Sequence, residues 1–136
     1  MKVFISHSQE NKALARSVGD ALERAGLDVW DEEQEIFPGD NWAEKTAKAL
    51  EEAQAMVVLL TPEALDSTLV SREIDFALSR ERFKNRLIPV LVGLDHSIAM
   101  EKLPWILRHL KVIKLPTSDK QEEGINKITQ ALQAVA

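Results

Sequence analysis

The chain has 136 residues, of which 45% are hydrophobic, and it carries a formal net charge of −5 and no cysteine. This length is typical of one domain with its own core, so we expect residues 1–136 to form a single domain. The acidic balance disfavours nucleic-acid binding through phosphate neutralisation. The absence of cysteine excludes disulfides, thiolate catalysis and cysteine-ligated metals. His7, His96 and His109 lack paired ligand spacing, so we predict no metal site.

The hydropathy pattern contains no candidate for membrane insertion. No apolar run approaches the ~20 residues that a membrane-spanning helix needs. Met1-Lys2 leads directly into a strand pattern, which does not resemble a secretory signal. We therefore expect a soluble, cytoplasmic protein that binds no membrane. Because no sensor domain is recognisable, we also expect either a module of a longer protein or a separate sensor protein as the trigger.

The first part of the chain alternates between short apolar runs and helical spacing. In order, the pattern predicts a strand at Val3–Ile5, a helix from Asn11 to Ala25, a strand at Leu27–Trp30, a helix ending at Ala53 and a strand at Met56–Leu60. Gly26 lies where a glycine commonly follows a helix. Asp40 or Asn41 is the expected cap of the second helix. The predicted buried face of that helix consists of Trp42, Ala43, Thr46, Ala47 and Leu50.

The loop between Asp31 and Asn41 contains two apolar residues, Ile36 and Phe37, followed by the turn-forming pair Pro38-Gly39. Two interpretations remain open from the sequence alone. Either the two side chains fold back onto the domain, or the loop protrudes and contacts a ligand or a neighbouring chain.

The segment that follows Met56–Leu60 contains a misplaced carboxylate. Thr61-Pro62 ends the strand, and Asp66 or Ser67 can cap the next helix. At about 100° per residue, one arc of this helix contains Leu69, Val70, Ile74, Ala77 and Leu78, and Glu73 lies within it. A carboxylate in an apolar arc must be paired, solvated by a cleft or neutralised. Glu73 is therefore the candidate working residue, and the alternative is a side chain that bends outward into solvent.

The second half continues the alternation. Leu87–Val92 predicts a strand in which Pro89 favours a sheet edge or a bulge. A connection of uncertain form runs from Asp95 to Leu110, and a short strand is predicted at Val112–Leu115. The last element is a helix over Gln121–Val135, whose inward residues are Ile125, Ile128, Leu132 and Val135.

Alternating strands and helices predict an α/β domain with a mostly parallel sheet. Right-handed crossovers favour a flavodoxin-like, doubly wound five-stranded sheet of order 2-1-3-4-5 with helices on both faces. The ligand crevice of such a sheet lies at the carboxyl ends of strands one and three. The residues expected there are Ser6, His7, Ser8 and Gln9, the segment from Thr61, the loop from Asp31 to Asn41, and Glu73.

Several ligand-binding classes that share this architecture do not fit. The sequence has no G-x-G-x-x-G after the first strand and no G-x-x-x-x-G-K-[ST] motif. A phosphorelay receiver would need acidic residues after strand one and an aspartate at the end of strand three. Here those positions hold Ser6-His7-Ser8 and Thr61-Pro62.

An ordered set of segments resembles the TIR domain family over nearly the whole chain. These segments are Val3 to Ser8, Leu27 to Asp31, Ile36 to Gly39, Val57 to Pro62, and Ser67 to Glu73 with Ile74 and Ala77. The last segment is similar to the S-x-W-x-x-x-E stretch of the family, with Leu69 where relatives often carry an aromatic residue. The lean pattern is more similar to bacterial than to animal members.

The resemblance implies an enzyme that cleaves NAD⁺ between nicotinamide and ribose, with Glu73 as the catalytic residue and no cofactor beyond the NAD⁺ substrate. The substrate-binding residues that it implies are His7, Ser8, Gln9, Trp30, Asp31, Phe37 and Leu69. It also implies activation by self-association with other TIR domains, through a loop containing Ile36, Pro38 and Gly39. Family habit places such enzymes in antiviral defence or cell-death signalling.

One carboxylate is chemically sufficient for this reaction. Glycosidases need a second carboxyl group to protonate the leaving oxygen, whereas nicotinamide leaves NAD⁺ as a neutral molecule. A single anion can stabilise the oxocarbenium-like charge, and the product is ADP-ribose or a cyclic isomer. Two alternatives remain: a non-catalytic TIR–TIR adaptor module, and a related nucleoside-processing transferase.

Overall fold

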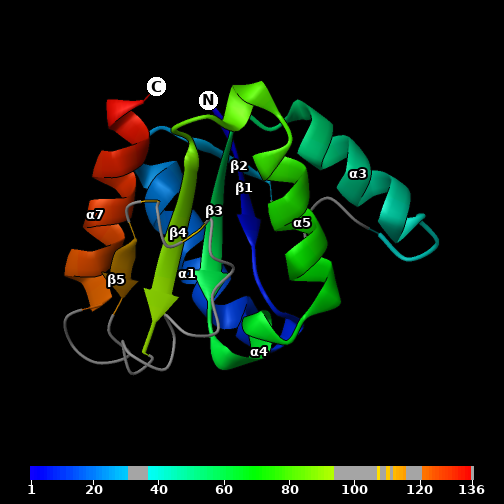
Figure 1. Cartoon of the computed structure of the whole chain (residues 1–136), viewed down its shortest axis with the longest axis horizontal. Coiled ribbons are helices and arrows are strands. Elements are labelled where there is room, and N and C mark those ends of the chain that lie inside the picture. Colours follow the sequence, from blue (N-terminus) through cyan, green and yellow to red (C-terminus); the bar gives the residue numbers. More distant parts are fainter. Residues whose placement is uncertain (31–36, 94–106, 108–109, 111, 116–120, 136) are drawn as a thin grey trace.

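The computed structural model describes residues 1–30, 37–93, 107, 110, 112–115 and 121–135. Its centre is a five-stranded sheet of order β2-β1-β3-β4-β5, in which all neighbouring strands are parallel (Figure 1). The strands are β1 (Lys2–Ser6), β2 (Asp28–Trp30), β3 (Ala55–Leu60), β4 (Leu87–Val92) and β5 (Ile113–Leu115). The predicted order 2-1-3-4-5 is therefore confirmed.

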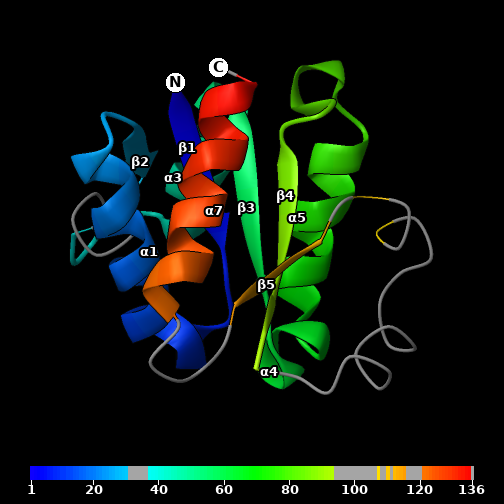
Figure 2. The same cartoon turned by 90° about the vertical axis from the view of Figure 1, so that its left-hand side faces the viewer.

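Helices cover both faces of the sheet. Helices α1 (Lys12–Arg24) and α7 (Gln121–Ala134) pack on one face, and α3 (Trp42–Glu52) and α5 (Thr68–Leu78) pack on the other (Figure 2). Shorter helical segments are η1 (Gln9–Asn11), α4 (Pro62–Leu65) and η2 (Glu81–Phe83). The sequence pattern did not predict α4, because a single turn is too short to show helical periodicity.

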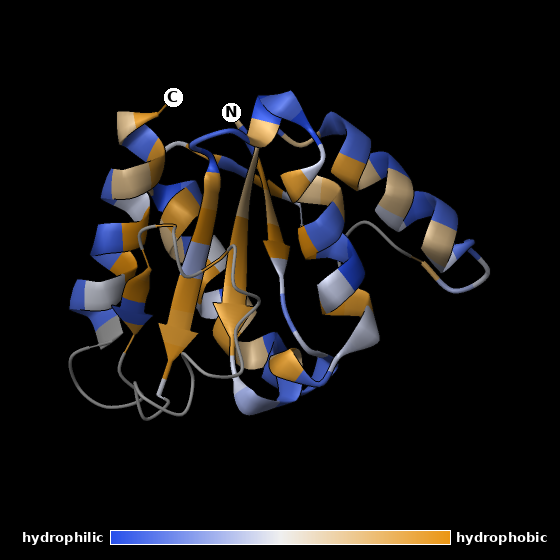
Figure 3. Cartoon of the chain, viewed as in Figure 1, coloured by the Kyte–Doolittle hydropathy of each residue, from blue (hydrophilic) through white to orange (hydrophobic). Residues whose placement is uncertain are grey.

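The core consists of two hydrophobic layers separated by the sheet. All six residues of β3 and all six of β4 are buried, as the continuous apolar runs predict. By hydropathy, both strands are predominantly hydrophobic (Figure 3). Because successive side chains of a strand point to opposite faces, Val57 and Leu59 belong to the layer under α1 and α7, whereas Met56 and Val58 belong to the layer under α3 and α5.

Local signals fix the helix ends. Asn41, rather than Asp40, caps α3, because its side chain accepts a hydrogen bond from the Glu44 amide at 3.1 Å. Ser67, rather than Asp66, caps α5 through the Val70 amide at 3.2 Å. Gly26 follows α1 with a φ of +92°, a conformation that a residue with a Cβ rarely adopts. The caps hold in place the two helices that contribute to the site.

The predicted inner faces of α3 and α5 are partly wrong. Trp42, Ala43 and Ala47 are exposed, and the buried residues of α3 are Thr46, Ala49 and Leu50. Helix α3 lies near the edge strand β2, which is only three residues long, so the sheet covers a narrower arc of the helix than the pattern predicted. Leu78 is 36% exposed because it ends α5.

The prediction that Pro89 marks an edge strand or a bulge is wrong. β4 lies between β3 and β5, and Pro89 is in regular register with Val58. The Met56 amide donates to the Arg86 carbonyl, so strand alternation directs the Pro89 nitrogen toward β5. β5 pairs with β4 only from Val90 onward. The N–H group that proline lacks would therefore not take part in any hydrogen bond between the described residues of the two strands.

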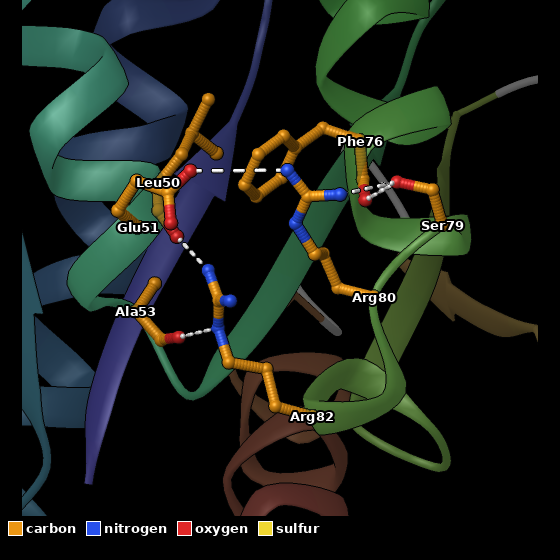
Figure 4. Close-up of polar contacts among 7 residues, drawn as sticks. All are labelled: Leu50, Glu51, Ala53, Phe76, Ser79, Arg80 and Arg82. Carbon is orange, nitrogen blue, oxygen red and sulfur yellow. Dashed lines mark hydrogen bonds and ion pairs between the residues drawn. The ribbon is translucent and has the colours of Figure 1, made fainter.

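Arg82, in η2, binds the end of α3 (Figure 4). Its guanidinium donates to the Ala53 carbonyl at 2.9 Å and to the Leu50 carbonyl at 2.6 Å, which satisfies acceptors at the end of α3. Arg80 and Glu51 form a longer pair of 3.8 Å with both side chains exposed, which contributes little. The segment after α5 is thereby tied to the end of α3.

Candidate functional site

Glu73 lies on the inner side of α5 and is only 6% exposed. Its helical neighbours Val70, Ile74 and Ala77 are buried against the sheet, as the apolar arc predicts. The alternative placement, in which the side chain bends outward into bulk solvent, is wrong. Nor is the carboxylate unpaired, because Ser6 Oγ donates a hydrogen bond of 2.7 Å to its Oε1 atom.

Ser6 is the last residue of β1 and is fully buried. It points to the same side of the sheet as Phe4, toward α5, because strand side chains alternate. The sequence placed Ser6 in the crevice but did not identify it as the partner of Glu73. The available signal was that Ser6 ends a buried strand on the face that α5 covers.

A recess that opens to solvent lies beside this pair. Its lining residues are Phe4, Ile5, His7, Gln9, Lys12, Ala15, Arg16, Gly19, Asp20, Glu23, Val29, Trp30, Thr46, Leu69 and Glu73. The predicted residues His7, Gln9, Trp30, Leu69 and Glu73 therefore surround one space, although they come from three separate segments of the chain.

Other predicted site residues lie elsewhere. Ser8 does not line the recess, because its side chain accepts from the Glu10 amide and caps η1. Phe37 is 63% exposed and is also absent from the lining. Pro38 and Gly39 form an exposed turn next to it. The predictions for Asp31 and Ile36 lie outside the described residues.

The recess has an apolar part and a charged part. Phe4 and Trp30 stack with ring centroids 5.3 Å apart, and Leu69 completes the apolar part beside Glu73. The charged part is formed by α1, which contributes two cations one turn apart, Lys12 and Arg16, and two carboxylates, Asp20 and Glu23. Neither cation was predicted, although a basic pair at i, i+4 at the start of the first helix was a usable signal. Such an arrangement suits a ligand with one flat apolar end and one polar, charged end.

His7 is oriented by its own backbone neighbour. Its Nδ1 atom lies 2.8 Å from the Ser8 carbonyl oxygen, which can only accept, so Nδ1 carries the proton. In the neutral ring, Nε2 is then a hydrogen-bond acceptor at the wall of the recess.

In the described part of the chain, no group of three or more His, Asp or Glu side chains is arranged to hold a metal ion. No helix in the same part is long and apolar enough to cross a membrane.

The fold and the recess define a flavodoxin-like α/β domain with a buried carboxylate near the point where the strand order reverses. The family model described as "TIR domain" matches residues 3–129 of the chain. The chain therefore belongs to the TIR domain family.

Two curated bacterial relatives are 29% identical to the chain. One is the 2′ cyclic ADP-D-ribose synthase BtTIR of Bacteroides thetaiotaomicron, matched over 86 residues, 62% of this chain and 30% of that protein. The other is the NAD(+) hydrolase TcpC of Escherichia coli, matched over 101 residues, 74% of this chain and 32% of that protein. The matched region thus spans about a third of each relative.

A solved structure supports the fold. The TIR domain of the Toll-related receptor TRR-2 from Hydra magnipapillata superimposes with a TM-score of 0.71 at 20% identity. The alignment covers 96% of this chain and 97% of that domain.

Proposed function

We propose that the protein cleaves NAD⁺ at the bond between nicotinamide and ribose, with Glu73 as the catalytic residue. The observation that carries the proposal is the buried Glu73 carboxylate, held by Ser6 at 2.7 Å, at the wall of an open recess. The names of the two bacterial relatives, an NAD(+) hydrolase and a cyclic ADP-ribose synthase, support the same reaction class.

The chemistry requires one well-placed anion. When the bond between ribose C1′ and the pyridinium nitrogen breaks, the electron pair stays on nitrogen and nicotinamide leaves as a neutral molecule. Positive charge develops on the ribose, and a carboxylate in a water-poor recess stabilises it more strongly than one in bulk water. Ser6 Oγ fixes Oε1 of Glu73, so the carboxylate needs little reorganisation during the reaction.

The second step determines the product. Attack of water on C1′ forms the C–O bond and releases a proton, which gives ADP-ribose. Attack by a hydroxyl or ring nitrogen of the same nucleotide gives a cyclic isomer instead. Both products belong to the reaction class that we propose, and the mass of the product distinguishes ADP-ribose from a cyclic isomer.

Replacing the carboxylate by its amide is the direct test. We expect Glu73→Gln to lower nicotinamide release by about 100-fold or more, the loss typical when one electrostatic stabiliser is removed. The assay follows nicotinamide by chromatography with concentrated protein. Asp75→Asn is the matched control, because Asp75 is exposed on the same helix and does not line the recess.

Equal nicotinamide release by wild type and Glu73→Gln would contradict the proposal. Thermal unfolding checks that the Glu73→Gln protein is folded. If it is folded and releases nicotinamide as wild type does, the carboxylate is not needed for the cleavage.

A second candidate function is that of a non-catalytic module that binds other TIR domains. The observation that favours it is Phe37, a large apolar side chain that is 63% exposed beside the Pro38-Gly39 turn. Under this candidate, the protein self-associates through the loop, but no preparation consumes NAD⁺ at any concentration. The nicotinamide assay therefore separates the two candidates.

A further inference from the structure

Thr46 presents an unusual hydroxyl group to the recess. It lies in the middle of α3, is 6% exposed and lines the same space as Glu73 and Trp30. Among the buried side chains of the described residues, its Oγ1 is the polar atom that has no hydrogen-bond partner. A helical threonine usually satisfies its hydroxyl by bonding a carbonyl of the preceding turn, as Thr129 does with Ile125 at 3.2 Å.

An orphaned hydroxyl is costly unless something binds to it. A buried polar group without a partner loses its bonds to water and gains nothing in return. Valine has nearly the same shape and would avoid this loss, so packing alone does not favour threonine at this position. The hydroxyl therefore suits a group that enters the recess from outside.

The surroundings of Thr46 indicate which end of a ligand it would meet. Phe4, Trp30 and Leu69 make this part of the recess apolar and aromatic. Lys12 and Arg16 lie in the other part, together with Asp20 and Glu23, on the opposite face of the sheet. A dinucleotide would accordingly place its flat pyridine ring near Thr46 and its phosphates near the two cations.

We propose that Thr46 Oγ1 hydrogen bonds the carboxamide of the nicotinamide ring and selects the orientation in which NAD⁺ enters the recess. The carboxamide has an acceptor oxygen and two donor N–H groups, and a threonine hydroxyl complements either. This inference rests on the proposed function for the identity of the ligand. It goes further by assigning a specificity-determining residue to a helix that the sequence analysis did not associate with substrate.

The test is a cycle of binding measurements in which a change in the protein is combined with a change in the ligand. Calorimetry compares Glu73→Gln with Glu73→Gln/Thr46→Val, a background expected to hold NAD⁺ without consuming it. The two ligands are NAD⁺ and an analogue with unsubstituted pyridine in place of nicotinamide. We expect Thr46→Val to weaken NAD⁺ binding about three- to ten-fold, the value of one hydrogen bond, and to leave binding of the analogue unchanged.

Further variants separate a ligand contact from a structural role. Thr46→Ser keeps the hydroxyl and should retain at least half of the discrimination between the two ligands. Thr129→Val removes a hydroxyl outside the recess and should not affect binding. Since the Thr46 hydroxyl is unsatisfied without ligand, Thr46→Val should leave the melting temperature of the free protein unchanged or raised.

Each outcome decides the proposal. Equal weakening of both ligands, unchanged NAD⁺ binding, or no NAD⁺ binding in the Glu73→Gln background would overturn it. If the cycle gives the expected pattern but wild type releases no nicotinamide, the Thr46 contact stands and the proposed cleavage fails. If wild type cleaves NAD⁺ while the cycle shows no discrimination, the cleavage stands and the Thr46 contact fails.

Discussion

At the scale of single residues, the Glu73–Ser6 hydrogen bond connects the end of β1 to the inner side of α5. The bond joins residues 67 positions apart in the chain, so it depends on the packing of the helix against the sheet. A hydrogen bond to a charged group contributes about 1.5–3 kcal/mol to stability. The same contact thus has a structural role and, under the proposed function, a positioning role.

Removal of the Ser6 hydroxyl should affect both roles. We expect Ser6→Ala to lower the free energy of unfolding by about 1.5 kcal/mol, because the buried carboxylate loses a donor. If Glu73 acts on NAD⁺, kcat should fall while KM stays near its wild-type value, since the carboxylate is mispositioned but the recess is intact. Urea unfolding and nicotinamide release measure the two effects.

Ser71→Ala on the exposed side of α5 is the matched control and should change stability by less than about 0.5 kcal/mol. Equal stability losses for Ser6→Ala and Ser71→Ala would show that the hydrogen bond contributes nothing.

The sequence identified Glu73 because periodicity alone reveals a carboxylate in an apolar arc. It did not identify the unsatisfied Thr46 hydroxyl, which lies on a face that the pattern treats as ordinary core. Hydrogen-bond satisfaction depends on distances between side chains, and no one-dimensional pattern contains them. Thr46 was correctly expected to be buried, but nothing in its spacing suggested that its hydroxyl lacks a partner.

At the scale of secondary-structure elements, the distance between α7 and the sheet depends on a glycine, whereas the distance between α1 and the sheet does not. A Cβ added at Gly124 of α7 would lie 2.6 Å from Leu115 Cδ1 and 3.3 Å from the Lys114 carbonyl oxygen. A Cβ at Gly19 of α1 would meet Val29 and Ile5 at ordinary distances of 3.5 and 3.6 Å. Helix α7 therefore approaches β5 more closely than any residue with a side chain at this position would allow.

Alanine substitution should have different effects on stability at these two glycines. We expect Gly124→Ala to lower the free energy of unfolding by about 1–3 kcal/mol, because Leu115 is fully buried and cannot move freely. Gly19→Ala should be neutral or stabilising by up to about 1 kcal/mol, since alanine favours a helix. Urea unfolding of both variants is the measurement, and a Gly124→Ala protein as stable as Gly19→Ala would contradict the close approach.

The local sequence was enough to predict where helices α3 and α5 begin. It was not always enough to predict which face of a helix is buried. The caps Asn41 and Ser67 were among the predicted alternatives because capping is a local interaction. The exposure of Trp42 was not predicted, because it depends on how far the sheet extends beneath α3. That extent is set by β2, a strand of three residues at the edge of the sheet, and not by the sequence of α3 itself.

At the scale of the whole molecule, parallel strand order brings the recess together. Strands β1 and β3 are neighbours although α1, β2 and α3 lie between them in the chain, and the switch of direction leaves their carboxyl ends open. The alternation of elements was enough to predict this topology, and the topology was enough to predict that His7, Gln9 and Glu73 share one space. The contribution of α3 through Thr46 required the three-dimensional structure.

The exposed Phe37 determines what we expect at the level of assembly. The turn that carries it is held by two hydrogen bonds, from the Phe37 amide to Asp40 Oδ2 at 2.9 Å and from the Asp40 amide to the Phe37 carbonyl at 3.0 Å. A turn whose backbone is already ordered loses little backbone conformational entropy on association. Full burial of a phenylalanine contributes about 1.5–3 kcal/mol, or roughly ten- to a hundred-fold in an association constant.

If self-association through this loop activates NAD⁺ cleavage, nicotinamide release per molecule should rise with protein concentration. Phe37→Ser should shift that rise to at least about ten-fold higher concentration, because the apolar contact is lost while the recess is unchanged. Leu78→Ser is the matched control, since Leu78 is also an exposed apolar residue but lies at the end of α5. Light scattering on the same samples measures association directly. A Phe37→Ser protein that associates and cleaves as wild type does would exclude the loop as the contact, and activity independent of concentration would mean that the isolated chain needs no partner copy.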